Sequence, residues 1–356
     1  MNEREKALDH KCPNCGGKII FTPETGKWFC EHCKSEFDLE TLQKYNNASS
    51  KENNQSEKVD DKDTTYIEYH CKNCGAKIIA DDQTAATFCV YCGNTAILKS
   101  KLSGKFAPSK IIPFSKSKQD AIEAFKSLSK GRPLMPKFFN KQENIEKISG
   151  VYIPFWLYSI SSNGKLDGSC KKITTWVAGD YAYTKTDIFN VERDVDLVFN
   201  RVPVDGSTRF DNDIMNTIEP FDYNKMVDYN HAYLSGFLAE KYDVESTVAE
   251  EEANNRVIES TNNTLSNSLS SYSIRNIKNQ TVNHKTTKTE YVLLPVWMVN
   301  VKYNGEFYTF AMNAQSGEFV GNIPVDKPKA VMYAALVFII TFAIALFISY
   351  LIFIGG

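Results

Sequence analysis

The chain has 356 residues, enough for two or three domains, one of which can bury a full hydrophobic core. Its 41 Lys and Arg residues nearly balance 43 Asp and Glu residues, which excludes a globally basic nucleic-acid-binding protein. The mean hydropathy of −0.34 is that of a soluble protein, so any membrane-spanning character must be concentrated in one segment.

The N-terminal segment Met1–His10 is charged and lacks the apolar stretch of a secretory signal peptide. We therefore expect no export, and we expect the eight cysteines that occur in Cys-x-x-Cys pairs, out of nine in total, to stay reduced. These eight form four pairs, a pattern that favours metal binding over disulfides in a reducing compartment.

The four pairs predict two zinc ribbons, one at residues 9–38 and one at residues 66–98. The spacing within the two sets is identical, and each first pair is followed by a Lys-Ile-Ile strand. The predicted metal ligands are Cys12, Cys15, Cys30 and Cys33 in the first ribbon and Cys71, Cys74, Cys89 and Cys92 in the second.

Four thiolates that converge from two tight turns form a tetrahedral site that suits Zn²⁺, and we expect two structural zinc ions. Glycine after the second cysteine lets the backbone curl; Lys34 takes that place in one of the four turns. Iron bound as in rubredoxin is an alternative. A thioredoxin-type redox pair is less favoured, because it would open a helix rather than a strand.

The rest of the chain predicts an α+β multidomain protein. Residues 39–65 are rich in Asn, Ser and charged groups and predict a flexible linker, and residues 99–325 predict a β-rich α+β domain. Within that domain, 117–130 has the pattern of an amphipathic helix and 245–269 that of a long polar helix. Strands are expected over 173–184, 187–199 and 291–312, and Asp211 and Asp213 suggest a helix cap.

The β-rich domain also shows a possible internal duplication, around residues 151–200 and 290–323. A Pro-x-Trp sequence, at Pro154 and at Pro295, leads in both parts to an Asn-Gly pair at the same distance. Asn-Gly favours a type I′ turn, so both parts predict a strand that enters a tight hairpin. Two similar hairpins that arose by chance are the alternative.

Residues 330–354 predict a transmembrane helix. This segment is uncharged, and fifteen of its residues are Leu, Ile, Val or Phe. A helix of this length spans a hydrocarbon core of about 30 Å. Lys327 and Lys329 precede it and only two glycines follow, which predicts a single-pass protein of the cell membrane with its N-terminal bulk in the cytoplasm.

Charge favours protein partners over nucleic acid for the ribbons. Residues 9–38 contain four Lys against five acidic residues, and a zinc ion held by four thiolates adds negative charge. The segment 99–141 is the exception, with ten Lys and one Arg against two acidic residues, and it could meet anionic lipid or nucleic acid. A solvated face of a folded domain is the simpler interpretation of these lysines.

No enzymatic activity is predicted. The sequence has no P-loop, Gly-x-Ser-x-Gly or His-Glu-x-x-His motif, and four thiolates leave a zinc ion no open position for catalysis. Cys170, the ninth cysteine, has no neighbouring partner in sequence and is expected to be a small apolar core residue.

The features that carry a resemblance to known proteins are the four Cys-x-x-Cys turns, the Pro-Phe-Trp and Pro-Val-Trp segments, the stretch from Leu234 to Asp243 and the terminal apolar helix. Through these features the sequence resembles a family of bacterial membrane-anchored proteins with zinc ribbons of the transcription-factor-IIB type. The resemblance implies a role beside flotillin-like (SPFH) proteins and PspA-like, ESCRT-III-like membrane remodellers in envelope stress. We expect a membrane-anchored adaptor that recruits or scaffolds partner proteins, with a membrane-bound nucleic-acid-binding or transcription-related regulator as the alternative. The sequence leaves the oligomeric state open.

Overall fold

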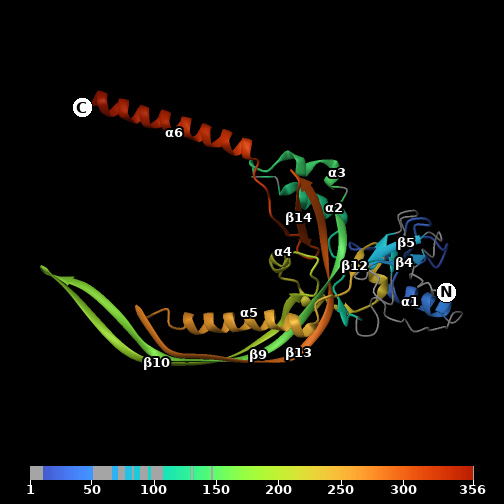
Figure 1. Ribbon diagram of the computed structural model, residues 1–356, viewed down its shortest axis with the longest axis horizontal. Helices are drawn as coiled ribbons and strands as arrows, with labels where there is room; N and C mark the ends of the chain where they lie inside the picture. The colour runs from blue at the N-terminus through green and yellow to red at the C-terminus, as the bar shows by residue number, and fades with distance from the viewer. Residues whose placement is uncertain are drawn as a thin grey trace.

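The computed structural model describes residues 11–50, 66–70, 77–81, 84–88, 95–97, 107–128, 130, 132–145 and 147–355. It is a mixed α+β structure with a β-rich body, a four-cysteine cluster near the N-terminus and one apolar helix at the C-terminus, as predicted. A long β arm and the C-terminal helix α6 (Lys327–Gly355) both project from the same side of the body (Figure 1).

The first ribbon is an antiparallel sheet of three short strands, β1 (Ile19–Thr22), β2 (Lys27–Cys30) and β3 (Glu36–Phe37). Helix α1 (Leu39–Ser50) follows at once. The prediction of a flexible linker is therefore wrong for residues 39–50; the remainder, 51–65, lies outside the described residues. The helix begins here because the Asp38 carboxylate accepts a hydrogen bond of 2.8 Å from the Thr41 amide and because Leu42 is buried in the core.

The second predicted ribbon is described only in its strands. β4 (Tyr66–His70) and β5 (Lys77–Asp81) form an antiparallel pair, whereas β6 (Thr84–Phe88) and β7 (Thr95–Ile97) belong to the large sheet. β6 joins that sheet by pairing with β12 (Leu238–Glu240). The segment is thus attached to the body through backbone hydrogen bonds.

The large sheet has the strand order β11-β8-β13-β9-β12-β6-β7. Its two central strands, β9 (Ser149–Ala178) and β13 (Ile274–Tyr303), are 30 residues long and antiparallel to each other. The remaining strands are β8 (Lys110–Ile111), β10 (Tyr181–Asp205), β11 (Val227–Asp228), β14 (Glu306–Asn313) and β15 (Phe319–Gly321).

Short helices cover the part of the sheet that lies in the body. They are α2 (Lys118–Ser127), α3 (Gln142–Ile145), α4 (Asn212–Thr217) and the 3₁₀ turns η3 (Lys137–Asn140), η4 (Tyr223–Lys225) and η5 (His231–Leu234). α2 is the predicted amphipathic helix, with Ala121 and Phe125 buried and a Ser117–Asp120 capping box. α4 begins where predicted, because Asp211 accepts from the amides of Asp213 and Ile214.

The first part of β9 is buried on both faces, and its residues alternate between two cores. Ile153 and Phe155 face a core with Val292 and Leu294 of β13, whereas Tyr152 and Tyr158 face the larger core that also contains the first ribbon. The body is therefore rigid at the point where β9 leaves it.

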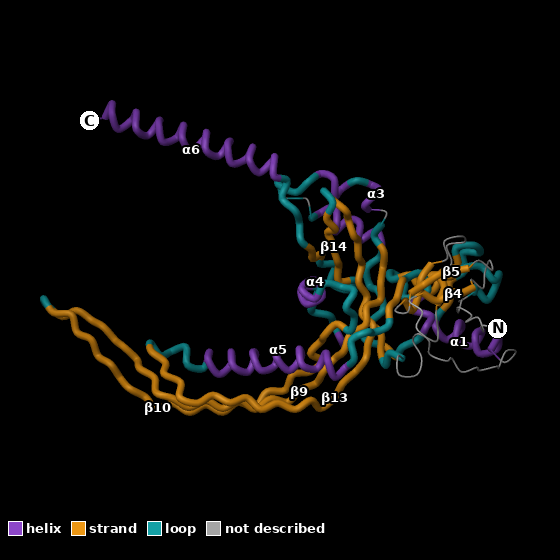
Figure 2. Tube along the Cα trace, in the orientation of Figure 1, coloured by secondary structure: helices purple, strands orange, loops and turns teal. Residues whose placement is uncertain are grey.

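Beyond the body, β9 (from residue 157), β10 (to residue 203) and β13 (residues 274–290) continue together as a ribbon, which we call the arm (Figures 1 and 2). The ribbon is three-stranded up to residue 171 of β9, and from there to the turn it consists of β9 and β10 alone. β9 lies in the middle, paired with β10 on one side and β13 on the other. At about 3.3 Å per residue, a strand of 30 residues is about 100 Å long.

Helix α5 (Ser246–Asn267) lies along one face of the arm (Figure 1). It is the predicted long polar helix, and it buries one stripe: Ala249, Ala253, Val257, Thr261 and Leu265. Beneath it, Leu166 and Cys170 of β9 and Val191 of β10 pack with Leu265 and Leu269. Cys170 is fully buried there, as expected of a small apolar residue. We call this side of the arm the α5 face and the opposite side the bare face.

One of the two predicted hairpins is wrong. Asn304 and Gly305 have φ angles of 50° and 89° and form the turn between β13 and β14, as predicted. Asn163 and Gly164 instead lie inside β9, opposite Asp196 and Val195 of β10. The chain stays extended there because Gly164 provides space for α5: a Cβ atom on it would lie 2.6 Å from Cγ2 of Thr261. The separate strands expected over 173–184 and 187–199 are likewise replaced by one hairpin with its turn at Gly179 and Asp180.

Candidate metal centre and interaction surfaces

The four cysteines of the first ribbon lie on two turns with the same backbone pattern. In the first turn, the Cys12 amide donates to the Gly17 carbonyl and the Gly16 amide donates to the Cys12 carbonyl, both at 2.8 Å. In the second, the Cys30 amide donates to the Ser35 carbonyl at 2.9 Å and the Lys34 amide donates to the Cys30 carbonyl at 3.0 Å. The fifth residue of each turn has a positive φ, 72° at Gly16 and 63° at Lys34.

This geometry brings the four Sγ atoms within 4.8 Å of one another. The Sγ atoms of Cys12 and Cys33 are 3.5 Å apart, and those of Cys15 and Cys30 are 3.6 Å apart. Sulfurs that surround a zinc ion tetrahedrally at about 2.3 Å are separated by about 3.8 Å. The cluster can therefore hold a metal ion, and a set of four soft thiolates suits Zn²⁺ or iron.

The thiols of the cluster differ in their electrostatic surroundings. Burial raises the pKa of the Cys12 thiol to about 12. The hydroxyl and backbone amide of Ser35 lower the pKa of Cys33 to about 6, and the Ser35 hydroxyl oxygen lies 3.3 Å from its sulfur. The cluster thus combines one thiol in an apolar environment with one whose thiolate form is stabilised by hydrogen bonds. Both must be deprotonated to bind a metal.

The first ribbon is docked firmly on the body. Trp28 of β2 is 1% exposed, and its indole Nε1 donates to the Ala232 carbonyl of η5 at 2.8 Å. The Phe21 amide donates to the Ser235 carbonyl at 3.0 Å, and the Tyr233 ring lies 5.1 Å from that of Trp28. The metal cluster and the β-rich body therefore share one core.

The ligands predicted for the second ribbon, Cys71, Cys74, Cys89 and Cys92, lie outside the described residues. Of the histidines near the cysteines, His32 lies beside the first cluster. If Gly17 carried a Cβ atom, that atom would lie 3.1 Å from the Cβ atom of His32. The first cluster already offers four sulfurs, so His32 is not needed to complete a tetrahedral site.

Helix α6 is long and apolar enough to cross a membrane. Within Lys327–Tyr350, a window of 18 residues has a mean hydropathy of 2.8, and none of that window is buried by other parts of the described chain. The start of the helix is tied to the body, because the Asp326 amide donates to the Leu134 carbonyl at 2.8 Å and Lys329 Nζ donates to the Met135 carbonyl at 3.0 Å.

The end of the arm carries a cluster of exposed apolar side chains that sequence reasoning did not identify as a surface. We call it the tip cluster: Ile173, Trp176, Val177, Tyr181, Tyr183, Ile188 and Phe189. The rings of Trp176 and Tyr183 stack at 5.6 Å across the hairpin, yet 46% and 45% of these side chains remain exposed. The density of aromatic residues was visible in the sequence, but it was interpreted only as a sign of strands.

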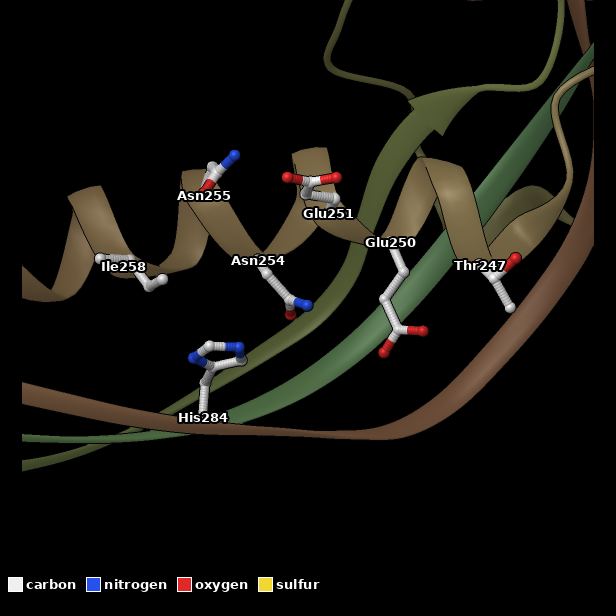
Figure 3. A pocket seen from close by; sticks show the side chains of 7 residues that line it. All are labelled: Thr247, Glu250, Glu251, Asn254, Asn255, Ile258 and His284. Atoms are coloured by element: carbon white, nitrogen blue, oxygen red, sulfur yellow. The ribbon is translucent and has the colours of Figure 1, made fainter.

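A shallow hollow lies between α5 and β13 (Figure 3). His284 of β13 points toward Asn254 on the helix, and Glu250 projects from the helix beside them (Figure 3). The hollow is lined mainly by polar side chains, with hydroxyl, carboxylate, amide and imidazole groups.

A group of partly buried charges connects the middle of α5 to neighbouring segments of the chain. The Arg256 guanidinium donates to the Pro203 carbonyl at 2.9 Å and forms ion pairs with Glu252 at 2.9 Å and Glu219 at 3.4 Å. Burial raises the pKa of Glu219 to about 7, although Arg256 opposes this shift, and burial also raises the pKa of Asp205 to about 6.

One relative fixes the family of this chain. The uncharacterized protein YdjG of Bacillus subtilis (strain 168) is 35% identical to it over 322 residues, which cover 90% of this chain and 92% of YdjG. The chain belongs to the YdjG family. No family model matches it, and no solved structure matches it.

The match to YdjG includes more than the β-rich body. A match of 322 residues is longer than the whole segment 107–325, and it leaves only 34 of the 356 residues unmatched. The arm lies between residues 157 and 290, so 34 unmatched residues are too few for the whole arm to lie outside the match. The matched region therefore includes residues of the arm.

Proposed function

We propose that this protein is a membrane-anchored adaptor. In this proposal α6 is the single transmembrane span of a protein of the cell membrane, and the N-terminal bulk lies in the cytoplasm. Lys327 and Lys329 precede the apolar segment, which supports this orientation.

Zinc has a structural role in the proposal, with one ion in each ribbon. The first cluster would use Cys12, Cys15, Cys30 and Cys33, and the second would use Cys71, Cys74, Cys89 and Cys92. Four thiolates leave no open coordination position, so the ions stabilise the ribbons rather than catalyse a reaction. A fixed first ribbon also fits a structural role, because its Trp28 is buried against the body.

The observation that carries the proposal is the tip cluster at the end of a long arm. Exposed aromatic side chains in one patch are typical of protein-binding sites, in which Trp and Tyr contribute most of the binding energy. The strands that carry the cluster are rigid at their base, where β9 is buried on both faces. Such an arm can hold a binding surface at a fixed distance from the body.

The resemblance stated above suggests which proteins bind. Flotillin-like (SPFH) proteins and PspA-like, ESCRT-III-like membrane remodellers are the proposed partners, with recruitment or scaffolding at the membrane during envelope stress as the proposed role. The nearly neutral balance of charge supports protein partners over nucleic acid.

The tip cluster provides the test. The intact protein is purified from membranes through an affinity tag, and the proteins that accompany it are identified for the parent and for the variant Trp176→Ala/Tyr183→Ala. The variant should lose the main partner, because the removal of central aromatic residues from an interface costs at least about 2 kcal/mol each. A matched control, Thr174→Ala/Lys185→Ala, changes the neighbouring cross-strand pair on the same face of the arm.

The control should retain the partner. Equal recovery of the partner by the parent and the tip variant would show that the tip cluster is not the binding surface.

A further inference from the structure

The arm has two long edges formed by different strands. Over the described residues, β10 pairs only with β9, and β13 pairs only with β9 from Ile274 to Glu290. Each outer edge therefore presents a row of backbone N–H and C=O groups that another strand could pair with. α5 lies along one face of the arm (Figures 1 and 2).

The two edges carry opposite charge. The segments that face each other across β9 residues 160–171 are 188–199 of β10 and 274–286 of β13. The first contains three acidic residues (Glu192, Asp194 and Asp196) and one basic residue (Arg193), a net charge of −2. The second contains three basic residues (Arg275, Lys278 and Lys285) and no acidic residue, a net charge of +3.

The charges also lie where an incoming strand would meet them. Glu192, Asp194 and Asp196 are all exposed on the bare face of β10, and Lys278 and Lys285 are exposed on β13. Two β10 edges would repel each other, and so would two β13 edges, whereas a β10 edge and a β13 edge attract. Charges on edge strands commonly prevent pairing; here their distribution prevents only the pairing of like edges.

The direction of the strands permits the pairing of unlike edges. Both β10 and β13 are antiparallel to β9, so they run in the same direction. Copies anchored in one membrane share one orientation relative to it, and arms side by side would bring β10 of one copy beside β13 of the next as parallel neighbours. This step rests on the membrane placement proposed above.

The register of the arm brings the complementary charges together. Val198 of β10 and Lys285 of β13 both lie opposite Ser161 of β9. In two copies at equal height, Lys285 of one copy would lie beside Val198 of its neighbour, with the carboxylate of Asp196 two residues away on the same face. The β13 segment between its two irregularities, Asn279–Thr286, is regular and available for pairing.

We propose that neighbouring copies of this chain associate through their arms, with the acidic β10 edge of one copy paired to the basic β13 edge of the next. The contact is heterologous, so a pair of copies keeps one free β10 edge and one free β13 edge, and the arms form a continuous sheet that grows into a chain or closes into a ring.

Reversal of the charges tests this proposal. Glu192→Lys/Asp196→Lys makes the β10 edge basic, and Lys278→Glu/Lys285→Glu makes the β13 edge acidic. The full-length protein in detergent should form oligomers in sedimentation velocity, and each variant alone should lose them because both of its edges then have the same sign. A mixture of the two variants should regain them, and so should one chain with all four substitutions.

The mixture of the two variants distinguishes a loss of association from a failure to fold. A variant that failed to fold would not be rescued by a second variant, so recovery in the mixture requires contact between edges. A wild-type protein that sediments as a monomer would overturn the proposal, as would single variants that associate like the parent or a mixture that does not associate.

Cross-linking in native membranes tests the register. Val198→Cys in one tagged copy and Lys285→Cys in another should form a mixed disulfide on mild oxidation. Within one chain the two positions are separated by β9, about 10 Å apart, which is too far for a disulfide. A control with Gly179→Cys at the turn should give no mixed disulfide with Lys285→Cys. If Val198→Cys forms no more mixed disulfide than this control does, parallel pairing at equal height is wrong.

Loss of partner binding by the tip variant without loss of oligomers would leave this proposal intact, since the tip cluster and the edges are separate surfaces.

Discussion

Lys34 shows how a backbone requirement can be met by a residue that does not favour it. The fifth residue of each cysteine turn has a positive φ, and Gly16 adopts it without cost, whereas a residue with a Cβ atom loses about 1 kcal/mol. The Nζ atom of Lys34 lies 5.6 Å from the centre of the Phe29 ring, and this cation–π contact offsets part of that cost. The sequence indicated the turn at Lys34 because the cysteine spacing repeats, even though the glycine does not.

The metal ligands give the first prediction at this scale. Cys30→Ser should lower the zinc content of the purified protein by one ion per chain, because a hydroxyl is a poor replacement for a thiolate at a four-sulfur site. Elemental analysis by mass spectrometry measures the content. Cys170→Ala removes a buried cysteine of the arm and should leave the content unchanged. An unchanged zinc content in Cys30→Ser would remove Cys30 from the ligand set.

Glu219 gives a second prediction, on the pH dependence of stability. Its pKa is raised from 4.5 to about 7, so the folded state binds the proton more tightly than the unfolded state does. The contribution of Glu219 to the free energy of unfolding is therefore fully present below about pH 4.5 and is lost as the pH rises through about 7.

The variant Glu219→Gln isolates this contribution, because glutamine cannot ionise. Relative to the parent, it should gain about 2 kcal/mol of unfolding free energy between about pH 5 and about pH 8, measured by urea denaturation. A difference from the parent that does not change with pH would mean that the carboxyl group of Glu219 titrates normally in the folded state.

At the scale of elements, the packing of α5 on the arm depends on small residues. A Cβ atom on Gly164 would meet the side chains of Thr261 at 2.6 Å and Leu265 at 3.1 Å. We expect Gly164→Val to destabilise the protein by about 1–3 kcal/mol through overpacking and to loosen α5. Hydrogen exchange should then become faster in α5 while the body stays protected.

The matched control is Ser169→Val, which adds the same side chain to the bare face of β9. It should leave exchange in α5 unchanged. Similar exchange in α5 for both variants would mean that Gly164 does not determine how closely the helix packs.

Local signals in the sequence predicted the short elements and failed on the arm. The amphipathic helix α2, the cap of α4 and the turn at Asn304 depend on neighbouring residues, and all three were predicted from them. The identical Asn-Gly pair at Asn163 stays extended, because its conformation is set by pairing with β10 and β13 and by packing under α5. Partners that are distant in sequence cannot be seen in a local pattern.

In the candidate sites, too, the features set by neighbouring residues were predicted and those set by distant contacts were not. The cysteine spacing predicted a cluster that can hold a metal ion, because the ligands come from two tight turns. The tip cluster could not be predicted as a surface, because alternating aromatic residues fit a buried strand as well as an exposed one. The arm extends beyond the end of α5 (Figure 1), which leaves Trp176 and Tyr183 uncovered, whereas other members of the cluster, such as Ile173, lie on the bare face.

At the scale of the whole molecule, the structure combines an apolar helix with an arm, each fixed to one rigid body. α6 is tied to the body by Asp326 and Lys329, and the arm by the buried part of β9. A partner held at the tip cluster would therefore be kept near the membrane that holds α6. This coupling of location to binding is the central claim of the proposed function.

The most direct test follows a partner that co-purifies with the intact protein, by fractionation of cells into membranes and soluble extract. Cells with the full chain are compared with cells whose chain ends at Asp326, which lacks α6. We predict that the partner is found with the membranes in the first case and in the soluble extract, still bound to the shortened chain, in the second. A partner that stays in the membrane fraction without α6 would contradict the adaptor function.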